Sequence, residues 1–184
     1  VKNQTIEENQ LPHSIEAEQA VLGGLMLSNG SFDAVAELVA ESDFFSQDHR
    51  LIFQTMRALS IESKPLDVIT LSETLQNTNE FDHAGGAAYL VELANNTPSS
   101  ANVIAYAQIV LERSIIRQLI TAASDIVKKG HNPLGWDSSK LLADAEKKLA
   151  DIIENRPKLG GFQGINTLIE ESLERIDELF NSES

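Results

Sequence analysis

Four histidines are the side chains of this 184-residue chain best suited to binding a metal or transferring a proton. They are His13, His49, His83 and His131. Such chemistry needs histidines spaced to meet one another or a pair of carboxylates, and none of the four has that spacing. His49 stands beside Arg50 at the expected start of a helix, where we interpret it as a capping or surface residue. The sequence therefore predicts no metal-ligating residues.

Motifs for nucleophilic or nucleotide chemistry are also missing from the sequence. No serine lies in a GxSxG elbow, and no GxxxxGK[ST] loop follows the glycines of the 158–164 segment. Several aspartates precede or begin expected helices, and we interpret them as helix caps: Asp33, Asp43, Asp48 and Asp67. We expect this chain not to be an enzyme by itself, with no catalytic and no cofactor-binding residue.

The composition limits the classes of partner. There are 28 acidic and 14 basic residues, which give a formal net charge of −14. A surface of this charge repels phosphate backbones, so direct binding to nucleic acid is not expected. The chain has no cysteine, and its longest apolar run, Ala20 to Leu27, is far shorter than the roughly 20 residues that span a bilayer. These features predict a cytoplasmic protein that does not enter membranes.

The segment EAEQAVLGGLML, residues 16–27, has a helical pattern but contains two adjacent glycines. Each glycine costs a helix interior about 1 kcal/mol relative to alanine. We predict a helix capped by Ser14, in which a strip of small residues lets a second backbone approach closely. The alternative is that Gly23 and Gly24 lie in a loop.

Short helical patterns fill most of the first hundred residues. They run from Ser31 to about Ala40, through Leu51–Leu59, from a capping box that starts at Thr70, and from Gly85-Gly86 onward. No convincing alternating strand pattern occurs. The fold class is therefore predicted to be all-α, with a flexible arm at 1–13 and a compact globular head at 14–100.

One long helical pattern follows, from Ala101 to Lys129, and its apolar stripe changes side near Ser114. The two ends of such a helix must be covered by different partners. A turn at Gly130–Pro133 and a second amphipathic pattern, capped by Asp137 or Ser138, predict a helical hairpin over 101–155. The apolar stripe of the second half is wider than one helix hides, which favours self-association or a partner over folding back onto the head.

The C-terminal part of the chain is predicted to be a flexible linker at 156–164 followed by a separate amphipathic helix at 165–184. The apolar residues of this helix share one face, and we expect them to dock on another molecule. The docking residues are Leu168, Ile169, Leu173, Ile176 and Phe180.

Four segments, in order, resemble the N-terminal domain of bacterial replicative DNA helicases, the DnaB family. They are SIEAEQAVLGGLML from Ser14, HRLIFQTM from His49, GGAAYLVEL from Gly85 and SANVIAYAQIVLERSIIRQLI from Ser100. The resemblance covers essentially the whole chain. It implies a part of a hexameric 5′–3′ helicase whose ATPase domain, with its ATP and Mg²⁺, is expected only in the C-terminal region that this chain lacks.

The resemblance also implies partners. In this family the heads pair through their hairpins into a collar, which recruits primase; a helicase loader is a further partner, and DNA is engaged only by the full-length assembly. The chain is accordingly expected to form a homo-oligomer, between dimer and hexamer.

Particular residues are carried over from the family. The residues expected to mediate self-association are Ile115, Leu119, Ile120, Ile126, Leu142 and Leu149. Glu16 and Tyr89 are candidates for the primase-facing surface, the alternative for Tyr89 being a core aromatic with a satisfied hydroxyl. A different class remains open, a stand-alone acidic helical adaptor or loader-binding protein that shares the head.

Overall fold

The computed structural model describes residues 11–97 and 99–155, and within these ranges every regular element is a helix. Seven α-helices occur, with short 3₁₀ turns between some of them. The α-helices are α1 (Ile15–Leu27), α2 (Phe32–Ala36), α3 (Gln47–Ile61), α4 (Val68–Asn77), α5 (Gly86–Asn96), α6 (Val103–His131) and α7 (Ser138–Glu154). The 3₁₀ turns are η2 (Asn29–Ser31), η3 (Glu41–Asp43) and η4 (Ser100–Asn102). The predicted all-α fold class is confirmed.

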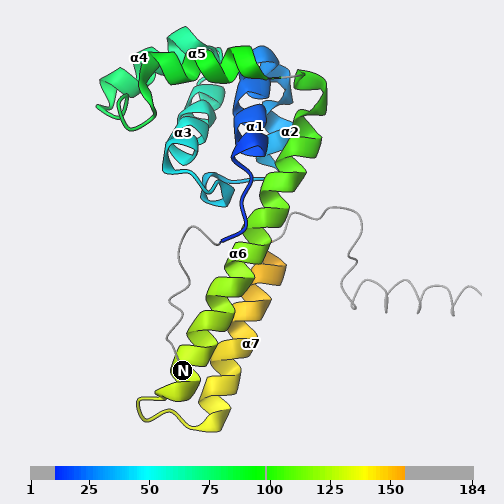
Figure 1. The fold of residues 1–184 in the computed structure, drawn as a ribbon, viewed down its shortest axis with the longest axis vertical. Coiled ribbons are helices and arrows are strands. Elements are labelled where there is room, and N and C mark those ends of the chain that lie inside the picture. Colours follow the sequence, from blue (N-terminus) through cyan, green and yellow to red (C-terminus); the bar gives the residue numbers. More distant parts are fainter. Residues whose placement is uncertain (1–10, 98, 156–184) are drawn as a thin grey trace, which may run out of the picture.

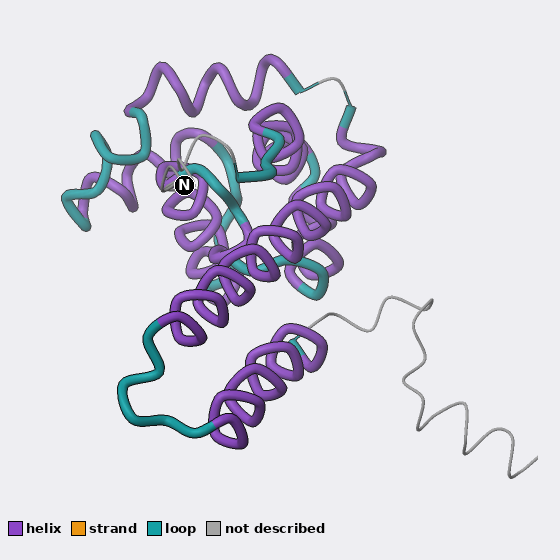
Figure 2. The backbone as a smooth tube through the Cα atoms, turned by 60° about the horizontal axis from the view of Figure 1, so that its bottom comes forward, coloured by secondary structure: helices purple, strands orange, loops and turns teal. Residues whose placement is uncertain are grey.

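Two parts are visible along the length of the molecule (Figure 1). The head consists of α1–α5 and the first half of α6, and the hairpin consists of the second half of α6 and α7. Figure 2 shows α7 returning alongside α6 after the loop at its far end. The predicted linker and C-terminal helix, with Leu168, Ile169, Leu173, Ile176 and Phe180, lie outside the described residues.

The head is built around α1, which packs against α3, α5 and α6. Ser14 caps α1 as predicted, its hydroxyl accepting the Ala17 N–H at 3.2 Å. Side chains from α1 to α6 form one core, in which the fully buried members include Leu22, Phe53, Leu71 and Leu90. The first half of α6 closes this core with Val103, Ala107, Val110 and Leu111.

The two glycines of α1 are helical, and the prediction that they permit close packing is confirmed. Gly23 lies against the Leu93 carbonyl and the Thr97 side chain at the end of α5. Gly24 lies against Val103, where an added Cβ would be 3.1 Å from Cγ2 of that valine. The loss of helix propensity is therefore offset by contacts with two neighbouring helices.

Two expected helix boundaries are wrong. The predicted helix from Ser31 to Ala40 ends at Ala36, because the backbone of Ala40 is extended and its N–H is bound by the Asp43 carboxylate at 2.8 Å. The helix expected from Thr70 begins at Val68 instead. Asp67 caps it by accepting the N–H groups of Ile69 and Thr70 at 2.8 and 2.9 Å, which displaces the capping box.

The hairpin is held by ion pairs as well as apolar contacts. Nζ of Lys129 lies 2.8 Å from the Asp144 carboxylate, and Nζ of Lys148 lies 3.0 Å from that of Asp125. Hydrogen bonds from Lys148 and Lys129 lower the pKa of Asp125, and the bond to Asp144 raises the pKa of Lys129. Asp137 caps α7 by accepting the Lys140 N–H at 2.8 Å, as predicted.

Candidate functional site

The hairpin presents an apolar surface that no described residue covers. Its most exposed large apolar residues on the two helices are Leu119 and Val127 of α6 with Leu142, Leu149 and Ile153 of α7. Leu119 is 47% exposed and Leu142 is 64% exposed. We call these five residues the hairpin stripe. None of the residues of α7 is buried.

The hairpin stripe and a groove lie on different sides of the hairpin. That groove, with a volume of about 1300 Å³, is lined by Thr121, Asp125 and Lys128 of α6 and by Lys148 and Asp151 of α7. At 100° per residue, Leu119 points away from Thr121 and Lys128 on α6, and Leu142 and Leu149 point away from Asp151 on α7. Both helices therefore direct apolar side chains to the same free side.

The structure divides the residues predicted for self-association into two groups. Leu119, Leu142 and Leu149 are exposed and belong to the hairpin stripe. Ile115, Ile120 and Ile126 are half-buried, and Ile115 packs against the core of the head. A change at Ile115 would therefore disturb the head as well as the hairpin.

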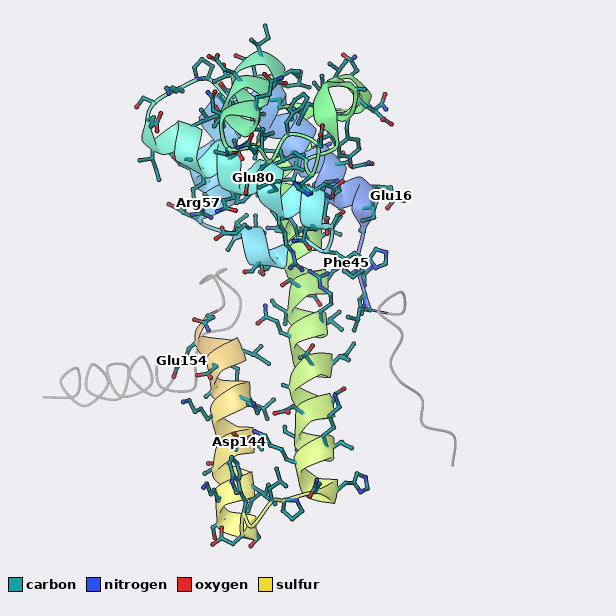
Figure 3. All side chains as sticks on the ribbon, turned by 90° about the vertical axis from the view of Figure 1, so that its left-hand side faces the viewer. Glu16, Phe45, Arg57, Glu80, Asp144 and Glu154 are labelled. Atoms are coloured by element: carbon teal, nitrogen blue, oxygen red, sulfur yellow. The ribbon has the colours of Figure 1, made fainter. Side chains whose placement is uncertain are left out.

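The two candidates for a primase-facing surface differ in their surroundings. Glu16 is exposed in the first turn of α1 and projects from the edge of the head (Figure 3). Tyr89 is half-buried on α5, and its hydroxyl accepts a hydrogen bond from the Gln19 amide at 3.2 Å. Burial raises the pKa of Tyr89, with the Gln19 bond opposing that effect.

Tyr89 is also bound by a histidine, which corrects the interpretation of His49. His49 is 1% exposed, so it is neither a cap nor a surface residue. Its Nδ1 lies 2.6 Å from the Glu18 carboxylate and its Nε2 lies 2.6 Å from the Tyr89 hydroxyl. The position of His49 on the buried face of α3 explains the error, since Ile52, Phe53 and Met56 share that face.

Glu18 completes this arrangement, which we call the head network: Glu18, Gln19, His49 and Tyr89. The buried Glu18 carboxylate also accepts the N–H groups of Phe45 and Ser46 at 2.6 and 3.3 Å. A buried carboxylate with three donors is fully compensated, which is the condition under which a charge is tolerated in a core. The head network joins α1, α3, α5 and the turn before α3.

The polar side chains of the head network bind one another inside the head. No group of three His, Cys, Asp or Glu side chains within 11–97 and 99–155 is placed to hold a metal ion. Likewise, none of the helices described is long and apolar enough to cross a membrane. The Glu18 carboxylate, both ring nitrogens of His49 and the Tyr89 hydroxyl are each bound by other protein groups.

Comparison with known proteins gives a consistent result. Residues 10–112 match the family of DnaB-like helicase N-terminal domains. Over 181 residues the chain is 44% identical to the replicative DNA helicase DnaB of Buchnera aphidicola subsp. Baizongia pistaciae, and over 174 residues it is 44% identical to that of Haemophilus influenzae. These matches cover 98% and 94% of this chain but only 39% and 37% of the two helicases.

Solved structures give the same answer for the fold. The N-terminal domain of DnaB helicase from Mycobacterium tuberculosis is 31% identical, with a TM-score of 0.74, covering 77% of this chain and 99% of that one. A DnaB-like replicative helicase, solved to show its interactions with primase, matches with a TM-score of 0.62 at 22% identity, covering 88% of this chain and 35% of that one. On this evidence, the chain belongs to the family of DnaB-like helicase N-terminal domains.

Proposed function

We propose that this chain is the assembly and primase-recruiting part of a hexameric replicative DNA helicase. The ATP-dependent 5′–3′ unwinding at the replication fork, with its ATP and Mg²⁺, then belongs to a C-terminal region outside this sequence. The relatives, of which the chain spans about two fifths, are replicative helicases. This supports a helicase part over the stand-alone acidic adaptor.

The observation that carries the proposal is the hairpin stripe. Burying one large apolar side chain is worth about 1.5–3 kcal/mol, so five of them on one side favour an interface. A second copy supplies the same apolar surface, which is the simplest way to cover it in a symmetric assembly. Pairs of hairpins would then generate a collar of heads. Such a protein would act in the cytoplasm and meet its loader there.

The hairpin stripe gives the first prediction. Leu119→Asp places a charge in the centre of the proposed interface, so we expect the dissociation constant of self-association to rise by at least about tenfold. Sedimentation equilibrium over a range of concentrations measures this constant. Ile69→Asp is the matched control, because Ile69 is 80% exposed on α4, away from the hairpin.

Two results would contradict this role of the stripe. One is a parent chain that stays strictly monomeric at high micromolar concentration. The other is an equal loss of association in the Leu119 and Ile69 variants, which would indicate that any added charge disperses the chain.

The recruitment of primase gives the second prediction. We expect Glu16→Lys to weaken the binding of primase to the assembled collar at least about fivefold, which corresponds to roughly 1 kcal/mol. The unfolding temperature should stay unchanged, because Glu16 is exposed. Isothermal titration with the primase helical domain is the measurement. Glu80→Lys carries the same charge change elsewhere on the head and should bind like the parent (Figure 3).

Tyr89 needs a different comparison, because its hydroxyl belongs to the head network. Tyr89→Phe removes only the hydroxyl, whereas Tyr89→Ala also removes a ring that packs on the core. A loss of primase binding per folded molecule in both variants would place the hydroxyl at the interface. Loss of stability with unchanged primase binding would assign Tyr89 to the core. Parent-like primase binding by Glu16→Lys would show that Glu16 is not part of the primase-binding surface.

A further inference from the structure

α6 carries two buried polar residues at the point where it leaves the head. Ser114 is 2% exposed and Arg117 is 8% exposed. They extend the row of α6 residues that faces the head, after Ala107, Val110 and Leu111. At this point polar contacts of α6 with the head join the apolar ones.

Arg117 binds two separate segments of the head. Its guanidinium donates to the Pro12 carbonyl at 2.8 Å and to the Asp43 carbonyl. It also lies over the Phe45 ring, 5.6 Å from the centroid, and that ring stacks on His13 at 4.1 Å. One side chain therefore ties α6 to the segment before α1 and to the turn before α3.

Asp43 makes the connection at a second point. Its carboxylate accepts the Ser114 hydroxyl at 2.6 Å and the Ala40 N–H at 2.8 Å. The Glu18 carboxylate holds the next residues of this turn, Phe45 and Ser46, through their N–H groups. The turn is therefore fixed to α1 on one side and to two turns of α6 on the other. Figure 3 shows Phe45 at this junction, between the head and the emerging helix.

Beyond Arg117 the second half of α6 lines a groove together with residues of α7 and of the head. Its lining includes Ser114 and Arg117 with Phe45 and Arg50 of the head, as well as Lys128 and Asp151 of the hairpin. Apolar contacts are not directional, so they allow a helix to rotate or tilt on a core. Charge-assisted hydrogen bonds to fixed carbonyls restrict both motions, and the planar guanidinium fork makes them specific in direction.

We propose that Arg117, together with Asp43 and Ser114, is a positioning clamp that sets the direction in which the hairpin leaves the head. The clamp determines where the hairpin stripe is held relative to the head. Its consequence for assembly rests on the proposed function, since a fixed hairpin meets a second copy at a lower cost in ordering.

The orientation can be measured without any assumption about assembly. The chain contains no cysteine, so Glu73→Cys on α4 and Lys147→Cys on α7 give two exposed sites for spin labels. Double electron–electron resonance on labelled chains diluted in unlabelled chains reports only the distance within one chain. In Arg117→Gln we expect the width of the distance distribution to roughly double, because both carbonyl contacts lose the charged fork. Arg113→Gln, an exposed arginine one turn earlier on α6, should keep the parent width.

The unfolding midpoint of the head separates positioning from general stability. A broadened distribution in a head that unfolds like the parent supports the clamp, and an unchanged width in Arg117→Gln overturns it. Should Arg117→Gln fail to fold, Arg117→Lys keeps the charge but lacks the fork, and a parent-like width in this variant overturns the clamp equally. Sedimentation then tests the consequence: a broadened distribution with unchanged self-association would leave the clamp in place and remove its link to the hairpin stripe.

Discussion

Gly23→Ala is expected to lower the free energy of unfolding of the head strongly. An alanine Cβ at this position would overlap Oγ1 of Thr97 and the carbonyl oxygen of Leu93, and it would lie 2.9 Å from the Leu93 carbonyl carbon. The threonine can rotate, but the Leu93 carbonyl is backbone within α5 and cannot move without shifting that helix. Overpacking of this kind costs about 3 kcal/mol or more, which exceeds the roughly 1 kcal/mol that alanine gains in helix propensity.

Two other glycines are matched controls for this result. Gly24→Ala would place its Cβ 3.1 Å from Cγ2 and 3.4 Å from Cβ of Val103 and 3.8 Å from Cα of Ser100, with no contact as close as those of Gly23. We therefore expect a stability within about 1 kcal/mol of the parent. Gly30→Ala has nothing within 4 Å and should be neutral. Urea unfolding followed by circular dichroism measures all three. A Gly23→Ala variant as stable as the Gly30 variant would show that α1 and α5 are packed more loosely than described.

The pattern of apolar residues was enough to predict most of the helices. The prediction succeeded for α1, α6 and α7 because their caps and periodicities agree with the tertiary packing. It failed at α2 and at the start of α4, where one carboxylate decides the boundary. Asp43 ends the α2 region by binding the Ala40 N–H, and Asp67 starts α4 two residues before the expected capping box.

The polar interior of the head was missed because charged residues were read one helix at a time. Glu18 shares the face of Val21, Leu22 and Leu25, three, four and seven residues later on α1. His49 stands in the same relation to Ile52, Phe53 and Met56 on α3. An acid and a histidine, each on a buried face, would have indicated a pair inside the core. Their partner Tyr89 could not be assigned from sequence alone, because the contact depends on the placement of α5.

The direction of the hairpin stripe was only partly accessible to sequence reasoning. The reversal near Ser114 correctly indicated different partners for the two halves of α6. It did not indicate that Ile115 would pack on the head while Leu119, one turn later, would be exposed. That distinction depends on where the head ends along the helix, which the buried polar residues Ser114 and Arg117 mark.

The second large effect is expected from breaking the head network at its centre. His49→Leu leaves the Glu18 carboxylate buried without its closest side-chain partner, and it leaves the Tyr89 hydroxyl with only the Gln19 amide. Removing one partner from a buried pair of this kind costs about 3–5 kcal/mol, against a total stability of about 5–15 kcal/mol for a domain. We therefore expect a large fall in the free energy of unfolding, measured by urea titration at neutral pH.

A double-mutant cycle tells whether this loss comes from the pair or from the fit of leucine at the site. Glu18→Gln keeps the shape and one acceptor oxygen, which can still bind the Phe45 N–H. Its NH₂ group replaces the oxygen that accepts the Ser46 N–H and lies against His49, so the negative charge and that acceptor are both lost. In the double variant the core contains no unpaired carboxylate. Its loss in the free energy of unfolding should therefore be smaller than the sum of the two single losses, by about 1–3 kcal/mol. Tyr89→Phe, which removes the hydroxyl bound by His49 and Gln19, should cost about 1–2 kcal/mol, less than His49→Leu. If the losses in the Glu18 and His49 variants simply add, the two side chains stabilise the head independently. The Glu18 carboxylate would then act through its bonds to the Phe45 and Ser46 N–H groups, without help from His49.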